Sequence, residues 1–312
     1  MKKIAYLMSA ISAGLFSSAA HADISVAGSA SVAYNGAGGN TTIIHGGSVS
    51  FGLSTTTDSG MTISSGAGIT RDTDGAGSAA VTGLSSVSFA TGGATITAGY
   101  DIGVADGAAS VGELVTVADL NSNGVTNTGG MGDDEGAGVS LSTSFGGAAL
   151  SVVYIYDKVA GAVTSGDLDG AANTGTSVAI SMPVAGGTFG ANYASGDVNG
   201  TTDTETSATF AYPTAGGTLT LGYGSFEGDT TTTNGTTFGV AYSMDLDGTA
   251  IGVGYQSYDV NSASGNSTDV TVSRSLGGGA SVFAEMRNTG GTVGTTTTKS
   301  TSTVAIGSSI SF

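Results

Sequence analysis

The chain has 312 residues, with 24 Asp and Glu residues against 7 Lys and Arg residues and a formal net charge of −17. The absence of cysteine excludes disulfide bonds and thiolate metal sites. The excess of negative charge excludes a surface that follows the phosphates of a nucleic acid. Charged residues make up only 10% of the chain, well below the roughly 25% of a typical soluble domain.

The first 22 residues have the pattern of a secretory signal peptide. The start MKK is basic, the middle is apolar, and Ala20 and Ala22 provide the small residues of a cleavage site. A membrane-spanning helix is disfavoured because the apolar stretch is short and no stop-transfer pattern follows it. We therefore expect residues 1–22 to be removed and residues 23–312 to form one exported domain.

After the signal peptide, short runs alternate apolar side chains with small polar ones. In SFATGGATITAGYD (88–101), Phe89 and Ile96 share one face of a hairpin, Ser88 and Thr97 share the other, and a double glycine provides the turn. Each run has about ten residues, the length that a tilted strand needs to cross a bilayer. The pattern predicts strands whose large apolar side chains face lipid and whose Ser, Thr and Gly face a water-filled interior.

Short and long connections alternate along the chain, and their number gives the number of strands. Seven short turns are predicted at 57–60, 91–93, 145–147, 183–187, 213–217, 245–248 and 276–279. Eight longer connections, rich in Asn, Asp, Thr and Gly, are predicted near 35–41, 71–79, 103–136, 158–174, 197–205, 228–235, 259–267 and 288–300. Because fifteen connections join sixteen strands, we expect an all-β fold, a 16-stranded antiparallel transmembrane β-barrel with short periplasmic turns and long outer loops.

A catalytic function finds little support in the sequence. The only histidine after residue 22 is His45, and neither a nucleophile elbow nor a histidine-centred triad pattern occurs. His45 shares the apolar parity of Ile43 and Val49, which favours a structural role. We therefore expect no enzyme.

Both ends of the chain resemble a known family. DISVAGSASVAYNG (23–36) and SVSFGLSTTTDSGMTISSGAGI (48–69) are similar to the opening hairpins of the Gram-negative general porins of the Rhodobacter type. SLGGGASVFAEM (275–286) is similar to the family's penultimate turn and strand, and Phe312 matches its terminal aromatic residue. The resemblance implies a 16-stranded homotrimeric barrel that contacts the lipid of the outer membrane.

The resemblance also implies a constriction, because the third outer loop of such porins folds into the barrel and its acidic residues face basic ones on the wall. The longest connection, 103–136, is the third outer loop by count, and we expect a short helical turn over 111–120. Its candidates for the constriction are Asp106, Glu113, Asp133, Asp134 and Glu135. The alternative is that these carboxylates only solubilise an external loop.

This chain departs from the family in its basic residues. After the signal peptide only five remain, Arg71, Lys158, Arg274, Arg287 and Lys299. By parity, Glu285 and Arg287 face the lumen, whereas Arg274 lies near the periplasmic rim, where a long side chain can extend to the interface. We therefore expect a channel that prefers cations and has a weaker transverse field than its relatives.

One segment of the third outer loop is similar to a calcium-binding loop. In DLNSNG, Asp119, Asn121 and Asn123 offer oxygen ligands and Gly124 permits a sharp turn. The EF-hand pattern fails because its twelfth position is Gly130 rather than Glu. An ordinary Asx-turn loop is the alternative, so a structural Ca²⁺ is the one cofactor that the sequence suggests, and none is required.

The expected function is passive diffusion of small hydrophilic solutes and ions through an outer-membrane channel. A different class, an exported β-rich structural protein or adhesin, has a similar composition, but a solenoid would repeat with connections of similar length. A substrate-specific channel would need aromatic or arginine tracks along the lumen, and the small side chains of the polar parity argue against them.

Overall fold

The computed structural model describes residues 23–37, 40–71, 80–103, 135–157, 173–198, 201–228, 234–260, 263–293 and 296–312. No helix in this part of the chain is long and apolar enough to cross a membrane. The strands are β1 (Asp23–Ala37), β2 (Asn40–Thr56), β3 (Thr62–Arg71), β4 (Ala80–Thr82), β5 (Ser86–Thr91), β6 (Ala94–Gly103), β7 (Glu135–Phe145), β8 (Ala148–Asp157), β9 (Asn173–Val184), β10 (Gly187–Val198), β11 (Thr201–Thr214), β12 (Gly217–Gly228), β13 (Gly235–Leu246), β14 (Thr249–Val260), β15 (Ala263–Gly277), β16 (Ala280–Val293) and β17 (Thr296–Ser311).

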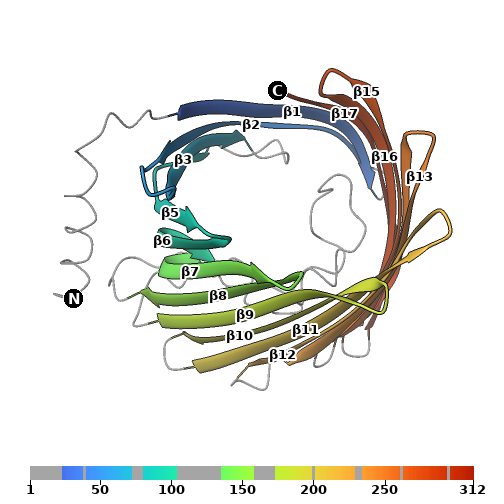
Figure 1. Ribbon diagram of the computed structural model, residues 1–312. Coiled ribbons are helices and arrows are strands. Elements are labelled where there is room, and N and C mark those ends of the chain that lie inside the picture. The colour runs from blue at the N-terminus through green and yellow to red at the C-terminus, as the bar shows by residue number, and fades with distance from the viewer. Residues whose placement is uncertain are drawn as a thin grey trace.

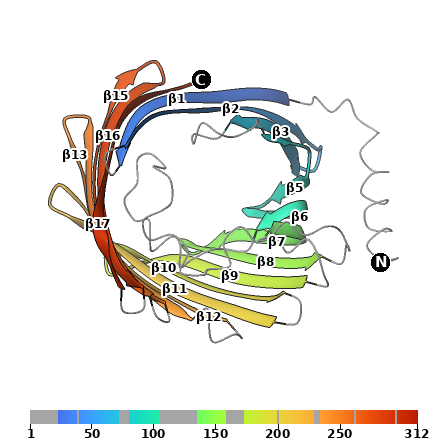
Figure 2. The ribbon, with the colours of Figure 1, turned by 180° about the vertical axis from the view of Figure 1, so that it is seen from behind.

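The strands form one antiparallel sheet that closes into a barrel because β1 pairs with β17 as well as with β2. Figures 1 and 2 show this closure, with the first and last strands side by side. β4 and β5 both pair with β3 and together occupy one position, so the strands fill sixteen positions around the barrel. The sequence-based prediction of a 16-stranded antiparallel barrel is confirmed.

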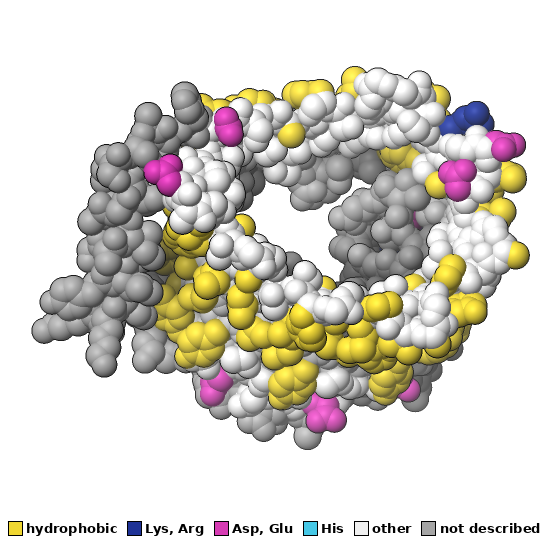
Figure 3. Space-filling model, viewed as in Figure 1, with side chains coloured by type: hydrophobic (Ala, Val, Ile, Leu, Met, Phe, Trp, Pro, Cys, Tyr) yellow, Lys and Arg dark blue, Asp and Glu magenta, His cyan; other side chains and the backbone are white. Residues whose placement is uncertain are grey.

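The alternation of side chains decides which face of each strand is outside. On β1, Val26 and Tyr34 are 55% and 51% exposed, whereas Ala33, on the other parity, is 5% exposed. Figure 3 shows hydrophobic side chains over the outer face of the strands and a hollow through the middle of the molecule. A closed barrel with an apolar outer face satisfies its backbone hydrogen bonds between strands and can meet lipid.

Seven tight turns lie at one end of the barrel, which we call the turn end; the opposite end is the loop end. The turns between β5 and β6 and between β7 and β8 each place two glycines at positive φ, as primed hairpin turns require. In the turn between β13 and β14, Asp247 has a φ of 51° and the Asp245 carboxylate accepts a hydrogen bond from the Gly248 amide. All seven turns lie where the sequence predicts them.

The strands at the loop end are longer than the sequence predicts. β2 has 17 residues and β17 has 16, compared with the predicted run of about ten. Four of the predicted long connections are therefore mostly strand. At these connections one strand ends and the next begins only three positions later, as in Ala37 to Asn40, Val198 to Thr201, Val260 to Ala263, and Val293 to Thr296. All four segments are polar, and two of them, 197–205 and 288–300, are rich in threonine, whose β-branched side chain favours strands, so polarity alone misplaced the strand ends.

Candidate functional site

Most of the predicted constriction lies outside the described residues. This holds for Asp106, Glu113, Asp133 and Asp134, for the calcium ligands Asp119, Asn121 and Asn123, and for the helical turn at 111–120. Glu135 is the first residue of β7, but its side chain is not among those described. The structure therefore leaves these roles as predictions, and the site described below is the inner wall of the barrel.

A buried polar cluster spans three neighbouring strands of this wall. Glu285 and Arg287 on β16 are 2% and 7% exposed, on the opposite parity from the exposed Val282 and Met286. Arg287 Nε donates to Asp269 Oδ1 on β15 at 2.5 Å, and Arg287 Nη2 lies 3.8 Å from Glu285 Oε1. One guanidinium therefore lies between two carboxylates, which leaves the three charged groups with a net charge of −1.

Hydrogen bonds extend this cluster to the next strand. Ser267 Oγ lies 3.0 Å from Asp269 Oδ2 and 3.0 Å from Gln256 Oε1 on β14, and all three side chains are fully or almost fully buried. Ser267 has a single hydroxyl hydrogen, and the carboxylate is the stronger acceptor for it. The Gln256 amide donates a hydrogen bond to Ser267 Oγ, and so completes the series of hydrogen bonds, if its nitrogen rather than its oxygen faces Ser267.

The other described arginine does not contribute a positive charge to this wall. Arg274 is exposed near the end of β15 at the turn end, and its Nη1 donates to Thr249 Oγ1 at 3.2 Å. Among the described side chains, Arg287 is therefore the one basic group on the inner face.

A further buried carboxylate lies on the inner wall, three strands away from Gln256. Glu205 on β11 is 1% exposed and is paired across the sheet with Ala194 on β10 and Phe226 on β12. Ala194 and Phe226 are themselves buried and form an apolar cluster. The described inner wall thus has three buried acidic side chains, Glu205, Asp269 and Glu285, and one basic side chain, Arg287. Its charge is therefore predominantly negative.

The prediction that Ser, Thr and Gly face the interior does not hold at every position. Ile102, Val153 and Ile155 form a buried apolar cluster, although Tyr154 and Tyr156 beside them are exposed. The register between β6 and β7 shifts between Gly99 and Ile102, and such a bulge moves the following side chains to the other face. Ile102 therefore faces inward despite sharing the sequence parity of the exposed Tyr100.

Sequence reasoning found Glu285 and Arg287 by parity but missed the three residues that surround them. Asp269 has the same inward parity, opposite to Val270 and Val272, and this signal could have identified it. Its pairing with Arg287 depends on the register of β15 and β16, which the sequence does not determine. Within the described residues no group of three or more His, Asp or Glu side chains could hold a metal ion.

The family model of the Gram-negative porins matches residues 9–308. The chain therefore belongs to the Gram-negative porin family, whose members are outer-membrane channels rather than enzymes. No curated protein matches the chain.

Solved structures share the fold over nearly the whole chain. A loop-deletion variant of OmpT, an outer membrane protein of Vibrio cholerae, has a TM-score of 0.75 at 13% identity and covers 93% of this chain and 99% of its own. OmpT in a trimer form has a TM-score of 0.68 at 11% identity, with coverage of 93% and 99%. A mutant of the Rhodobacter blastica porin has a TM-score of 0.65 at 15% identity, with coverage of 93% and 100%. The barrel is thus a porin fold.

Proposed function

We propose that the protein is a passive diffusion channel for small hydrophilic solutes and ions, and that it prefers cations. The charge balance of the inner wall carries the proposal, because Arg287 is outnumbered by Asp269, Glu285 and Glu205. A lumen with an excess of carboxylates concentrates cations and depletes anions at low ionic strength. The channel requires no cofactor and performs no catalysis.

We further propose that the third outer loop adds to this selectivity. Its carboxylates Asp106, Glu113, Asp133, Asp134 and Glu135 then form the acidic side of a constriction whose basic side is weak. A calcium ion at Asp119 would reduce the acidic charge of the loop. The protein functions as a homotrimer, a proposal supported by the trimer form of the similar OmpT structure.

Single-channel recording in planar bilayers tests the channel and its preference together. In a potassium chloride gradient we expect the reversal potential to lie on the side of the equilibrium potential of K⁺ rather than that of Cl⁻. The preference should weaken as salt shortens the Debye length from roughly 30 Å at 0.01 M to about 3 Å at 1 M. The measurement is repeated with a calcium chelator, so that any bound calcium is removed.

A quadruple variant that neutralises Asp106, Glu113, Asp133 and Asp134 then isolates the loop. Its reversal potential should lie closer to zero, while the heat-stable oligomer on gels remains. Anion preference of the wild type at low salt, with and without the chelator, would contradict the proposal. A folded protein that stays in the outer membrane but conducts no ions would instead favour a structural protein or adhesin.

A further inference from the structure

The Asp269 carboxylate has one side-chain partner at each of its two oxygens. Arg287 Nε donates to Oδ1 at 2.5 Å, and Ser267 Oγ donates to Oδ2 at 3.0 Å. Gly254, directly opposite Asp269 on β14, has no side chain that could add a third contact. Among the described side chains, Ser267 is therefore the one group other than the arginine that fixes the plane of this carboxylate.

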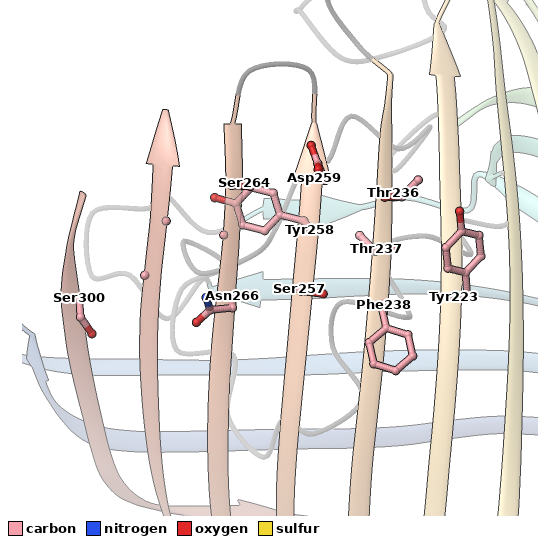
Figure 4. A pocket seen from close by; sticks show the side chains of 13 residues that line it. Tyr223, Thr236, Thr237, Phe238, Ser257, Tyr258, Asp259, Ser264, Asn266 and Ser300 are labelled. Atoms are coloured by element: carbon pink, nitrogen blue, oxygen red, sulfur yellow. The ribbon is translucent and has the colours of Figure 1, made fainter. Parts of the chain in front are cut away.

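The register of β14 and β15 directs the hydrogen bonds of this cluster toward Asp269. Ser257 and Asn266 lie side by side in Figure 4, and the same register places Gln256 opposite Ser267 on the inner face. Gln256 Nε2 has no hydrogen-bond partner among the described residues. With this nitrogen turned toward Ser267, the amide donates to Oγ, and the single hydroxyl hydrogen is left for the carboxylate. The series of donors therefore ends at Asp269.

Asp269 in turn determines where Arg287 points. Within the described part of the chain, Asp269 is the only hydrogen-bond partner of the Arg287 side chain, and Glu285 Oε1 lies farther away, at 3.8 Å from Nη2. Thr303, directly opposite Arg287 on β17, is half-buried and uncharged. Because Arg287 is only 7% exposed, the one basic group on the described inner face lies against the wall instead of extending into the lumen.

We propose that Ser267 is a positioning residue for ion selectivity. Its hydroxyl fixes the Asp269 carboxylate, which holds the Arg287 guanidinium against the wall and keeps its positive charge away from the ion path. Without this hydroxyl the carboxylate can rotate, the contact with the arginine weakens, and the guanidinium extends toward the lumen, where it attracts anions. This inference rests on the proposed cation preference and names the residue that maintains it.

Ser267→Ala tests the inference, because it removes the hydroxyl without changing the charge of the wall. We expect the ratio of K⁺ to Cl⁻ permeability at low salt to fall about twofold, the effect of a unit charge at roughly 8 Å from an ion in water. Ser267→Thr keeps a hydroxyl and should retain the wild-type ratio. Ser281→Ala is the matched control, because it removes a hydroxyl that lies 2.7 Å from Ser309 Oγ on the same inner wall, away from Arg287.

An Arg287→Gln background shows whether Ser267 acts through the arginine. If Ser267 only supports packing, Ser267→Ala changes the permeability ratio equally in both backgrounds. If Ser267 positions the guanidinium, the substitution no longer changes the ratio once the guanidinium is absent. We expect the second result, with heat-modifiable migration retained in all variants.

A chemical measurement reports the position of the arginine independently of selectivity. Phenylglyoxal modifies accessible guanidinium groups, and peptide mapping separates Arg287 from the exposed Arg274, which is the internal standard. In the folded wild type we expect Arg287 to react much more slowly than Arg274. Ser267→Ala should accelerate the reaction of Arg287 about tenfold, as the loss of one hydrogen bond to a charged group would give, and should leave that of Arg274 unchanged.

The two measurements separate failure of this inference from failure of the proposed function. A wild-type reversal potential on the side of Cl⁻ would contradict the cation preference, and the modification rates would still decide the role of Ser267. A rate at Arg287 that Ser267→Ala leaves unchanged would overturn the inference. So would an equal effect of Ser267→Ala on the permeability ratio with and without Arg287.

Discussion

At the scale of the residue, Arg287 shows how a charged side chain is accommodated on the inner wall. A buried guanidinium without partners would cost several kcal/mol, and here Asp269 and Glu285 supply two carboxylates. The direct contact is with Asp269, while Glu285 lies at a longer distance and contributes the excess negative charge. The two carboxylates therefore have different roles, and substitution can separate them.

We predict that Glu285→Gln lowers the cation preference without unfolding the barrel. The variant keeps the contact between Arg287 and Asp269, and glutamine has nearly the shape of glutamate. A unit charge that an ion passes at a distance of about 8 Å changes the ion's energy by roughly 0.5 kcal/mol in water, or about twofold in local concentration. Reversal potentials at low salt measure the change.

Glu227→Gln is the matched control for this prediction, because Glu227 is exposed and shares the outward parity of Tyr223. It removes the same charge from the opposite face and should leave the reversal potential close to that of the wild type. An equal effect of the two substitutions would mean that overall charge, and not the inner wall, determines selectivity.

The same residues show what parity can and cannot predict. Parity placed Glu285 and Arg287 on the inner face because Val282, Ala284 and Met286, on the alternate positions, are apolar. Parity alone would group Ile102 with the outward-facing Tyr100, because nothing in the sequence marks the bulge after Gly99 that reverses the faces. A local pattern predicts faces as long as the register continues unbroken, and a bulge is decided by the neighbouring strand.

At the scale of the element, the hairpin of β14 and β15 pairs an aromatic ring with a glycine. Tyr258 is directly opposite Gly265, and a Cβ added to Gly265 would overlap the Tyr258 ring. The ring thus covers the unprotected glycine backbone of the neighbouring strand, an arrangement that supports strand pairing. In this hairpin β14 continues to Val260 and β15 starts at Ala263, so both strands extend beyond the apolar part of the wall.

We predict that Gly265→Val displaces Tyr258 and destabilises the barrel by about 1–3 kcal/mol, as overpacking commonly does. The temperature at which the folded form disappears in heat-modifiability gels measures this loss. Gly290→Val, where the added side chain meets open space, should have little effect. Equal stability of Gly265→Val and the wild type would show that Tyr258 moves aside at no cost.

The hairpins also show why sequence reasoning located the turns better than the loops. Glycine pairs such as Gly92-Gly93 mark a turn because few other residues adopt two successive positive φ angles. Threonine-rich segments such as 296–303 carry no comparable signal. They have the polarity of a loop and the β-propensity of a strand. This segment forms a strand because it pairs with β16.

At the scale of the whole molecule, aromatic side chains are unevenly distributed around the outer face. Outward-facing Tyr and Phe residues occur on most strands from β5 to β14, whereas the described parts of β15, β16, β17 and β3 present none. Aromatic residues at both interfaces are typical of a surface in contact with lipid. The neighbouring strands β15, β16 and β17 therefore have the composition of a surface that contacts protein, in agreement with the proposed homotrimer, whereas β1 and β2 carry the exposed aromatic residues Tyr34 and Phe51.

We predict that Ile306→Trp on β17 disrupts the trimer, because a large side chain at a packed interface prevents close approach of two copies. Ile306 is exposed in the single chain, as is Val178 on β9 in the aromatic-rich arc. Val178→Trp should leave the trimer intact, since lipid accommodates an additional aromatic residue. Cross-linking and unheated gels report the oligomeric state, and identical behaviour of both variants would place the interface elsewhere.

The pairing of β1 with β17, which closes the barrel, also has a consequence for biogenesis. This ladder joins residues from opposite ends of the chain, such as Ser29 and Ser311, so β1 keeps an open edge until the last strand is available. Contacts of such long sequence separation form slowly, and an open strand edge is a template for aggregation. A chain cut short before β17 would leave both β1 and β16 with open edges. The final residues of the chain thus remove both open edges by completing the ladder that closes the barrel.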